Sequence, residues 1–120
     1  MTDRALETRF LSLEESLRLL CDVSQETLQK ARQLSSPGSD RSAIERAILD
    51  GRAQRKKLED AIVRAQSAMR SMRAEMVRSL VDDYGMTITA VAKLMLVSRQ
   101  AASALYQEAS ASSANTYTRE

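Results

Sequence analysis

Glycine and proline are scarce in this chain, and this scarcity constrains its fold more than any other feature. The 120 residues include three glycines and one proline, and aromatic residues make up 3% of the total. Good helix formers such as Ala, Leu, Arg and Glu are abundant, whereas the β-branched and aromatic residues that favour strands do not gather in short runs. The composition therefore predicts an all-α protein and argues against a β-sandwich or an α/β fold.

The rarest residue types exclude several kinds of chemistry. Because the chain has no histidine, it cannot use an imidazole base or a His-containing metal site. Its single cysteine, Cys21, cannot form an intramolecular disulfide or a cysteine-cluster zinc site. The sequence contains no glycine-rich phosphate loop and no nucleophile motif. We therefore expect no enzymatic activity, no metal and no cofactor.

The distribution of charge and hydropathy bears on location and partners. No run approaches the roughly 20 apolar residues that span a bilayer, and the first residues lack a signal-peptide pattern. We expect a cytoplasmic protein that does not bind membranes. Residues 1–40 carry a net charge of −2, residues 41–86 carry +3 and residues 87–120 carry +1. An anionic partner would therefore prefer the second half of the chain.

Two long amphipathic segments precede a change of pattern near residue 85. Pro37 and Gly38 lie in a predicted loop over residues 35–40, and Asp40 or Ser39 can cap the helix that follows. Apolar residues on both sides of this loop recur in alternating steps of three and four, which is typical of a coiled coil. We predict an antiparallel coiled-coil hairpin within residues 1–67, with the first helix ending at Leu34 and the second running from about Arg41 to Tyr84.

A two-helix core is thin, so the hairpin is expected to form a homodimer. The residues predicted to mediate dimerisation are the large apolar members of the repeat: Leu6, Phe10, Leu13, Leu17, Leu20, Leu58 and Ile62. A different protein bound to the hairpin is an alternative.

The segment after the second long helix predicts two shorter helices. Gly85 suits the left-handed position that ends a helix. Thr87 can cap a short helix from Ile88 to about Met95, and Ser98 can cap another that ends near Ser110. The small polar residues 111–120 are expected to form a disordered tail.

The run from Ile88 to Gln107 resembles the helix-turn-helix of phage-type repressors, related bacterial regulators and sigma-factor DNA-binding regions. The matching residues are an apolar–Ala pair in the first helix, apolar residues around the turn and one late in the second helix: Val91, Ala92, Met95, Val97 and Leu105. Two positions depart from the family pattern. Leu96 stands where the turn usually has Gly, so it would have to adopt a left-handed or altered turn. Ala102 stands where Val or Ile is usual.

The resemblance implies a DNA-binding unit over residues 68–110, whose second helix, residues 98–110, enters the major groove of double-stranded DNA. The implied base contacts are the outward-facing residues of that helix: Ser98, Arg99, Gln100, Ser103, Ala104 and Gln107. The implied contacts to the DNA backbone are Thr87, Thr89, Lys93, Arg73 and Arg78.

These inferences favour a small dimeric, sequence-specific DNA-binding protein, a transcriptional regulator associated with the nucleoid. On a two-fold axis, its half-sites would lie ~34 Å apart. Two alternatives remain open at this level. One is a helical coiled-coil adaptor that binds other proteins without reading DNA, and the other is a nucleoid-type protein that binds DNA without sequence preference.

Overall fold

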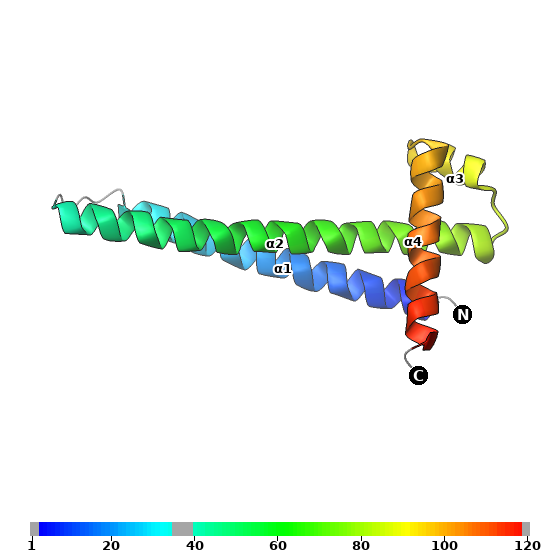
Figure 1. Ribbon diagram of the computed structural model, residues 1–120, viewed down its shortest axis with the longest axis horizontal. Helices are drawn as coiled ribbons and strands as arrows, with labels where there is room; N and C mark the ends of the chain where they lie inside the picture. Colours follow the sequence, from blue (N-terminus) through cyan, green and yellow to red (C-terminus); the bar gives the residue numbers. More distant parts are fainter. Residues whose placement is uncertain (1–2, 35–39, 119–120) are drawn as a thin grey trace. The chain divides into compact units, whose positions relative to one another are not determined.

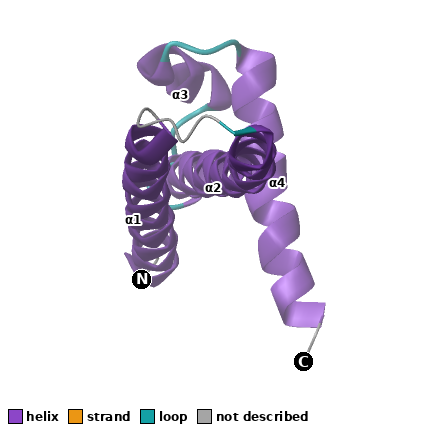
Figure 2. Ribbon diagram, turned by 90° about the vertical axis from the view of Figure 1, so that its left-hand side faces the viewer, coloured by secondary structure: helices purple, strands orange, loops and turns teal. Residues whose placement is uncertain are grey.

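Four helices make up the described part of the chain, residues 3–34 and 40–118, in a computed structural model. They are α1 (Asp3–Leu34), α2 (Arg41–Asp82), α3 (Ile88–Met95) and α4 (Arg99–Thr118) (Figure 1). No strand occurs in these residues, and short loops join α2 to α3 and α3 to α4 (Figure 2). The all-α class predicted from composition is confirmed. Residues 35–39 of the loop predicted over residues 35–40 lie outside the described residues.

The capping residues set most of the helix boundaries. The backbone N–H of Ala43 donates to Asp40 Oδ1 over 2.7 Å, so Asp40 caps α2. This satisfies one of the backbone donors that the first turn of a helix leaves free. At the other end, the chain leaves α2 through Gly85, which has φ 68° as expected, and the Met86 N–H donates to the Leu80 carbonyl over 3.0 Å.

The chain divides into two compact units that share α2. Glu14–Gln66 form one unit, named here the paired-helix unit, and Met1–Leu13 together with Ser67–Glu120 form the C-terminal unit. This division differs from the one drawn from the sequence, in which residues 1–67 formed a single region.

In the paired-helix unit, α1 and α2 run antiparallel and meet along small and polar side chains. The residues of this unit that are buried are Ser16, Val23, Gln54, Ala61 and Ala65. Gln54 Nε2 donates to Thr27 Oγ1 over 2.9 Å, which satisfies the buried amide and ties the two helices together.

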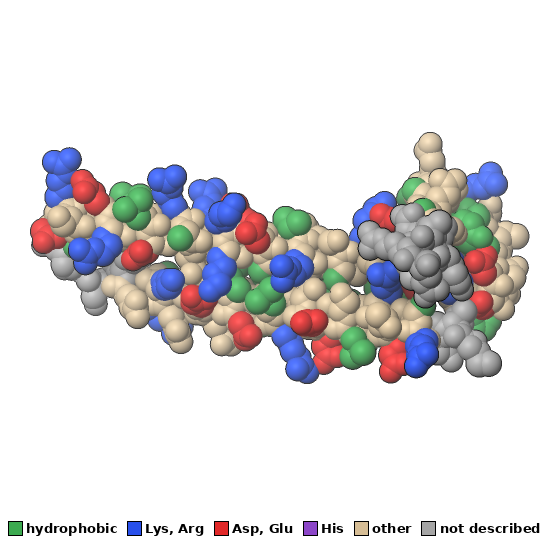
Figure 3. Space-filling model, turned by 60° about the horizontal axis from the view of Figure 1, so that its bottom comes forward, with side chains coloured by type: hydrophobic (Ala, Val, Ile, Leu, Met, Phe, Trp, Pro, Cys, Tyr) green, Lys and Arg blue, Asp and Glu red, His purple; other side chains and the backbone are tan. Residues whose placement is uncertain are grey.

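None of the large apolar residues predicted to mediate dimerisation is fully buried. Exposed members include Phe10, Leu17 and Ile62, while Leu6, Leu13, Leu20 and Leu58 are half-buried. Figure 3 shows exposed hydrophobic side chains among charged ones along the helices. Small side chains let two helix backbones approach closely, and this explains why the alanines of α2, not its isoleucines, face α1.

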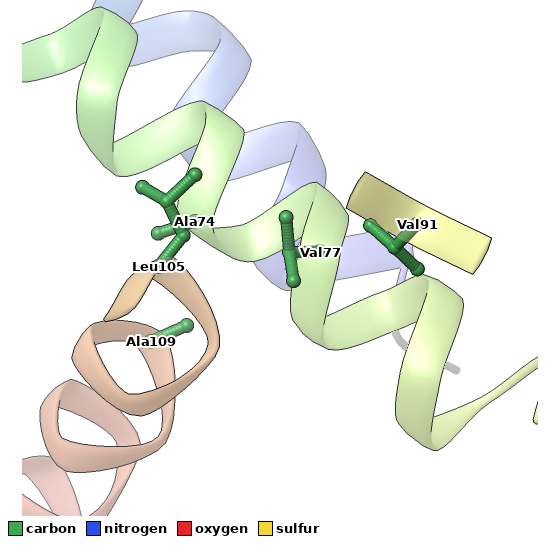
Figure 4. Packing of buried hydrophobic residues seen from close by; sticks show 5 residues of the cluster. All are labelled: Ala74, Val77, Val91, Leu105 and Ala109. Atoms are coloured by element: carbon green, nitrogen blue, oxygen red, sulfur yellow. The ribbon is translucent and has the colours of Figure 1, made fainter. Parts of the chain in front are cut away.

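The core of the C-terminal unit joins the end of α2 to α3 and α4. Its buried residues are Ala74 and Val77 of α2, Val91 of α3, and Leu105 and Ala109 of α4 (Figure 4). Half-buried side chains, among them Leu80, Met86 and Met95, pack against this cluster. The end of α2 therefore serves as a platform for the two shorter helices.

Helix α4 continues past the end predicted for it. The sequence predicted a helix ending near Ser110 and a disordered tail over residues 111–120, but α4 extends to Thr118. No proline or glycine interrupts this stretch, and its alanines favour continuation of the helix.

Candidate functional site

Side-chain caps fix the starts of both short helices at the candidate site. Thr87 Oγ1 accepts a hydrogen bond from the Ala90 N–H over 3.1 Å, and Ser98 Oγ accepts one from the Ala101 N–H over 3.0 Å. Both caps agree with the sequence prediction. Both capping bonds are made within the chain itself, so the first turns of α3 and α4 form without a binding partner.

The turn between α3 and α4 is built on a left-handed leucine. Leu96 has φ 58° and ψ 43°, and its backbone N–H donates to the Lys93 carbonyl over 3.3 Å. The next N–H, of Val97, donates to the Ala92 carbonyl over 3.0 Å. This pair of bonds is the Schellman arrangement that ends many helices. Leu96 therefore adopts the left-handed conformation, one of the two alternatives that the helix-turn-helix resemblance allowed at this position.

Small buried residues occur on both α3 and α4 at the candidate site. Ala92 on α3 and Ala102 on α4 are both buried, and Val91 is completely inaccessible. Ala102 occupies the position at which the family pattern has a larger residue, and here the alanine itself is fully enclosed. One side of each helix is therefore buried, and the other side of α4 is exposed to solvent.

The side chains predicted to contact bases lie on that solvent-facing side. Ser98, Arg99, Gln100, Ala104 and Gln107 are exposed, and Ser103 is half-buried. Three of them, Arg99, Gln100 and Ser103, line an open depression of about 420 Å³ together with Ile88. Ile88 was not among the predicted contacts. Its place as the first residue of α3, one residue after the cap, was the signal available in the sequence.

The predicted contacts to the DNA backbone divide into two groups. Thr87, Thr89, Lys93 and Arg73 are exposed. Arg78 differs, because only 14% of its side chain is exposed and its Nη2 lies 2.6 Å from Glu75 Oε1. Its guanidinium is already neutralised, so the structure gives no support to Arg78 as a phosphate contact.

The ion pairs of Arg78 belong to a polar network that connects α2 to α4. Asp82 and Asp83 lie 3.6 Å and 3.8 Å from the guanidinium of Arg78. The hydrogen bond to Glu75 is the main cause that raises the pKa of Arg78 above its usual value. From α4, the Tyr106 hydroxyl donates to Asp82 Oδ1 over 2.8 Å, and this bond raises the pKa of Tyr106.

A second polar link joins the same two helices. Arg70 of α2 lies 3.1 Å from Glu108 of α4. Both side chains are about half-exposed, so the pair orients α4 more than it stabilises the unit.

Comparison with protein-family models, with curated proteins and with solved structures finds no match to this chain. In the described residues, no helix is long and apolar enough to cross a membrane. Within the same part of the chain, acidic and cysteine side chains do not cluster in threes as a metal site would require.

Proposed function

We propose that this chain is a small, sequence-specific protein that binds double-stranded DNA and regulates transcription. In this proposal, α3 and α4 form a helix-turn-helix, and α4 enters the major groove. The observation that carries it is the row of exposed polar side chains at the start of α4, on a helix whose Leu105 and Ala109 are buried in one core with Val91 of α3.

The side chains at the start of α4 match the hydrogen-bonding edges of bases. An arginine such as Arg99 pairs in bidentate fashion with guanine O6 and N7, and a glutamine such as Gln100 pairs with adenine N6 and N7. Ser98, Ser103 and Gln107 offer further polar groups, while Ala104 and Ile88 offer apolar contact to a thymine methyl group. Ser98 also caps α4, so its hydroxyl is already fixed in direction.

The groups proposed to bind phosphates lie on α3 and on the end of α2. Thr87 and Thr89 are at the start of α3, where backbone N–H groups and the helix dipole favour an anion. Lys93 and Arg73 add one positive charge each. Because phosphate neutralisation supplies most non-specific affinity, two cations give a single chain weak affinity for DNA. We therefore include a homodimer in the proposal.

The proposal is tested by selecting bound sequences from a pool of random DNA duplexes at two salt concentrations. We expect an enriched motif, and a palindrome would indicate two copies of α4 reading two half-sites. Binding without enrichment that disappears at higher salt would indicate a nucleoid-type protein instead. Absence of binding at low salt would contradict DNA binding and favour an adaptor role for the paired helices.

Substitution of the two principal base contacts then tests the site itself. Arg99→Ala with Gln100→Ala should weaken binding to the enriched sequence by ~100-fold or more, because each bidentate pair contributes ~1–3 kcal/mol of discrimination. The matched control is Arg46→Ala with Gln29→Ala, which removes the same exposed residue types from the paired-helix unit. Equal losses in both double variants would contradict the assignment of the site.

A further inference from the structure

One edge of the paired-helix unit carries an uncovered apolar strip on α2. By helical spacing, Ala43, Ala47 and Ala61 share the side of α2 that carries the buried Gln54, and each is followed directly by an isoleucine. Since one residue turns a helix by about 100°, the three isoleucines share one side of the contact. The strip consists of Ile44, Ile48 and Ile62, which are exposed by 54%, 58% and 38%.

Helix α1 extends the same edge with two leucines. Leu17 follows the buried Ser16, and Leu28 follows Thr27, which bonds to Gln54 across the contact. In an antiparallel pair, residues that follow the contact positions on the two helices point to the same side, and residues that precede them point to the other. Leu17, Leu28, Ile44, Ile48 and Ile62 therefore form one surface, which we name the apolar edge.

The opposite edge is polar, which confirms this geometry independently. Lys57 precedes Leu58, and Glu26 precedes Thr27, so both should lie away from the apolar edge and near each other. Lys57 Nζ is in fact 2.8 Å from Glu26 Oε2. This bond lowers the pKa of Glu26. The two edges of the unit are thus chemically distinct.

The interior of the paired-helix unit is too small to account for its apolar residues. Among its described side chains, Val23 is the only large apolar one that is buried. A hollow of about 390 Å³ also opens where Gly51 leaves the contact without a side chain, with Leu58 and Ala31 in its lining. The bulky apolar side chains of this unit are therefore exposed, and an unfilled hollow lies between its helices.

We propose that the apolar edge is covered by the same edge of a second copy of this chain, so that four helices enclose one core. Ile44 and Ile62 lie about 27 Å apart along α2, and two adjacent helices are about 20 Å wide. A surface of these dimensions is of the order of the ~800 Å² that each partner buries in a standard interface.

The charges on the apolar edge favour an identical partner over a charged one. Arg55 and Glu59, which follow the contact positions Gln54 and Leu58, are paired with each other over 3.2 Å. They cancel within the chain, so two copies can meet on this edge without repulsion of like charges. This inference does not rest on DNA binding, because the interface lies within Glu14–Gln66.

The test is the mass of the full-length protein in solution without DNA, measured by sedimentation equilibrium across a range of concentrations. We expect twice the mass of one chain, and a dimer dissociation constant raised at least tenfold by Ile62→Lys. The matched control is Val63→Lys. Val63 is the next residue, also β-branched and 63% exposed, but it points away from α1 and the apolar edge.

Val63→Lys should change the dissociation constant less than twofold, and circular dichroism should show unchanged helix content in both variants. A wild-type protein that remains monomeric at all concentrations would overturn the proposal and leave the edge for a different protein. Equal weakening by the two variants would also overturn it, because the interface would then not follow the apolar edge. If Ile62→Lys alone loses helix content, Ile48→Gln provides a second test on the same edge, because glutamine is neutral and favours helix. We again expect weaker dimerisation for this variant.

Discussion

Leu96 stores backbone strain at the turn between α3 and α4. A left-handed conformation costs a residue with a side chain about 1–2 kcal/mol, and glycine avoids this cost. The Leu96 side chain is 92% exposed, so little packing is lost when it is removed. Leu96→Gly should therefore raise the free energy of unfolding by about 0.5–1 kcal/mol, after allowance for the greater freedom of glycine in the unfolded chain. Urea-induced unfolding followed by circular dichroism measures the change.

Gly85 provides the opposite substitution in the same unit. It has φ 68°, and a Cβ built there would meet no atom within 4 Å. Gly85→Ala therefore adds backbone strain without a steric clash, and it should lower the free energy of unfolding by about 1 kcal/mol. If both variants shifted stability in the same direction, the strain assigned to Leu96 would be wrong.

At the scale of elements, the end of α2 depends on one buried ion pair. The side chains of Arg78 and Glu75 are 14% and 5% exposed. Arg78→Met would leave the Glu75 carboxylate buried without its cation, and breaking a buried pair from one side costs ~3–5 kcal/mol. We expect a loss of about 3 kcal/mol in the free energy of unfolding, measured in urea at neutral pH.

Arg73→Met is the matched control for Arg78→Met. Arg73 is on the same helix but is exposed, and substitutions of this kind usually change stability by less than about 0.5 kcal/mol. A comparable loss of unfolding free energy in both variants would show that methionine disturbs α2 itself. The prediction that the ion pair stabilises the end of α2 would then be wrong.

The boundaries of α2, α3 and α4 at their starts were predictable because capping is local. Asp40, Thr87 and Ser98 each bond to a backbone N–H three residues later, so the sequence alone contains the signal. The left-handed Gly85 was predictable in the same way, whereas at Leu96 only the family resemblance implied a left-handed or altered turn. Ends without a side-chain signal were harder to predict, and α4 therefore extends beyond its predicted end.

The contact between α1 and α2 was not predictable from one repeat pattern. Two stripes on α2 recur at heptad spacing, one of alanines such as Ala61 and Ala65 and one of isoleucines such as Ile62. They are separated by about one residue's rotation, and hydrophobicity alone favours the larger side chains. Which stripe faces the neighbour depends on the helix across from it, and this information is not local.

At the scale of the whole molecule, α2 links the two proposed activities covalently. The same helix, Arg41–Asp82, carries the isoleucines of the apolar edge and, in Ala74 and Val77, the platform under α3 and α4. A dimer formed through the apolar edge therefore carries two copies of α4. The number of copies that bind together has a direct signature in the dependence of affinity on salt.

Lys93→Gln should reduce the salt dependence of DNA affinity, and the size of the reduction should show how many copies of the chain bind together. Each phosphate neutralised contributes about −0.9 to the slope of log K against log salt concentration. Lys93 is exposed on α3, so its removal should make the slope shallower by about 1.8 if two copies bind and by about 0.9 if one does. Fluorescence anisotropy on the enriched duplex at four or more salt concentrations gives the slope. Gln100→Ala is the control, because loss of a neutral base contact should lower affinity at every salt concentration and leave the slope unchanged. An unchanged slope in Lys93→Gln would remove Lys93 from the interface, and with it the proposed contact of α3 with the DNA backbone.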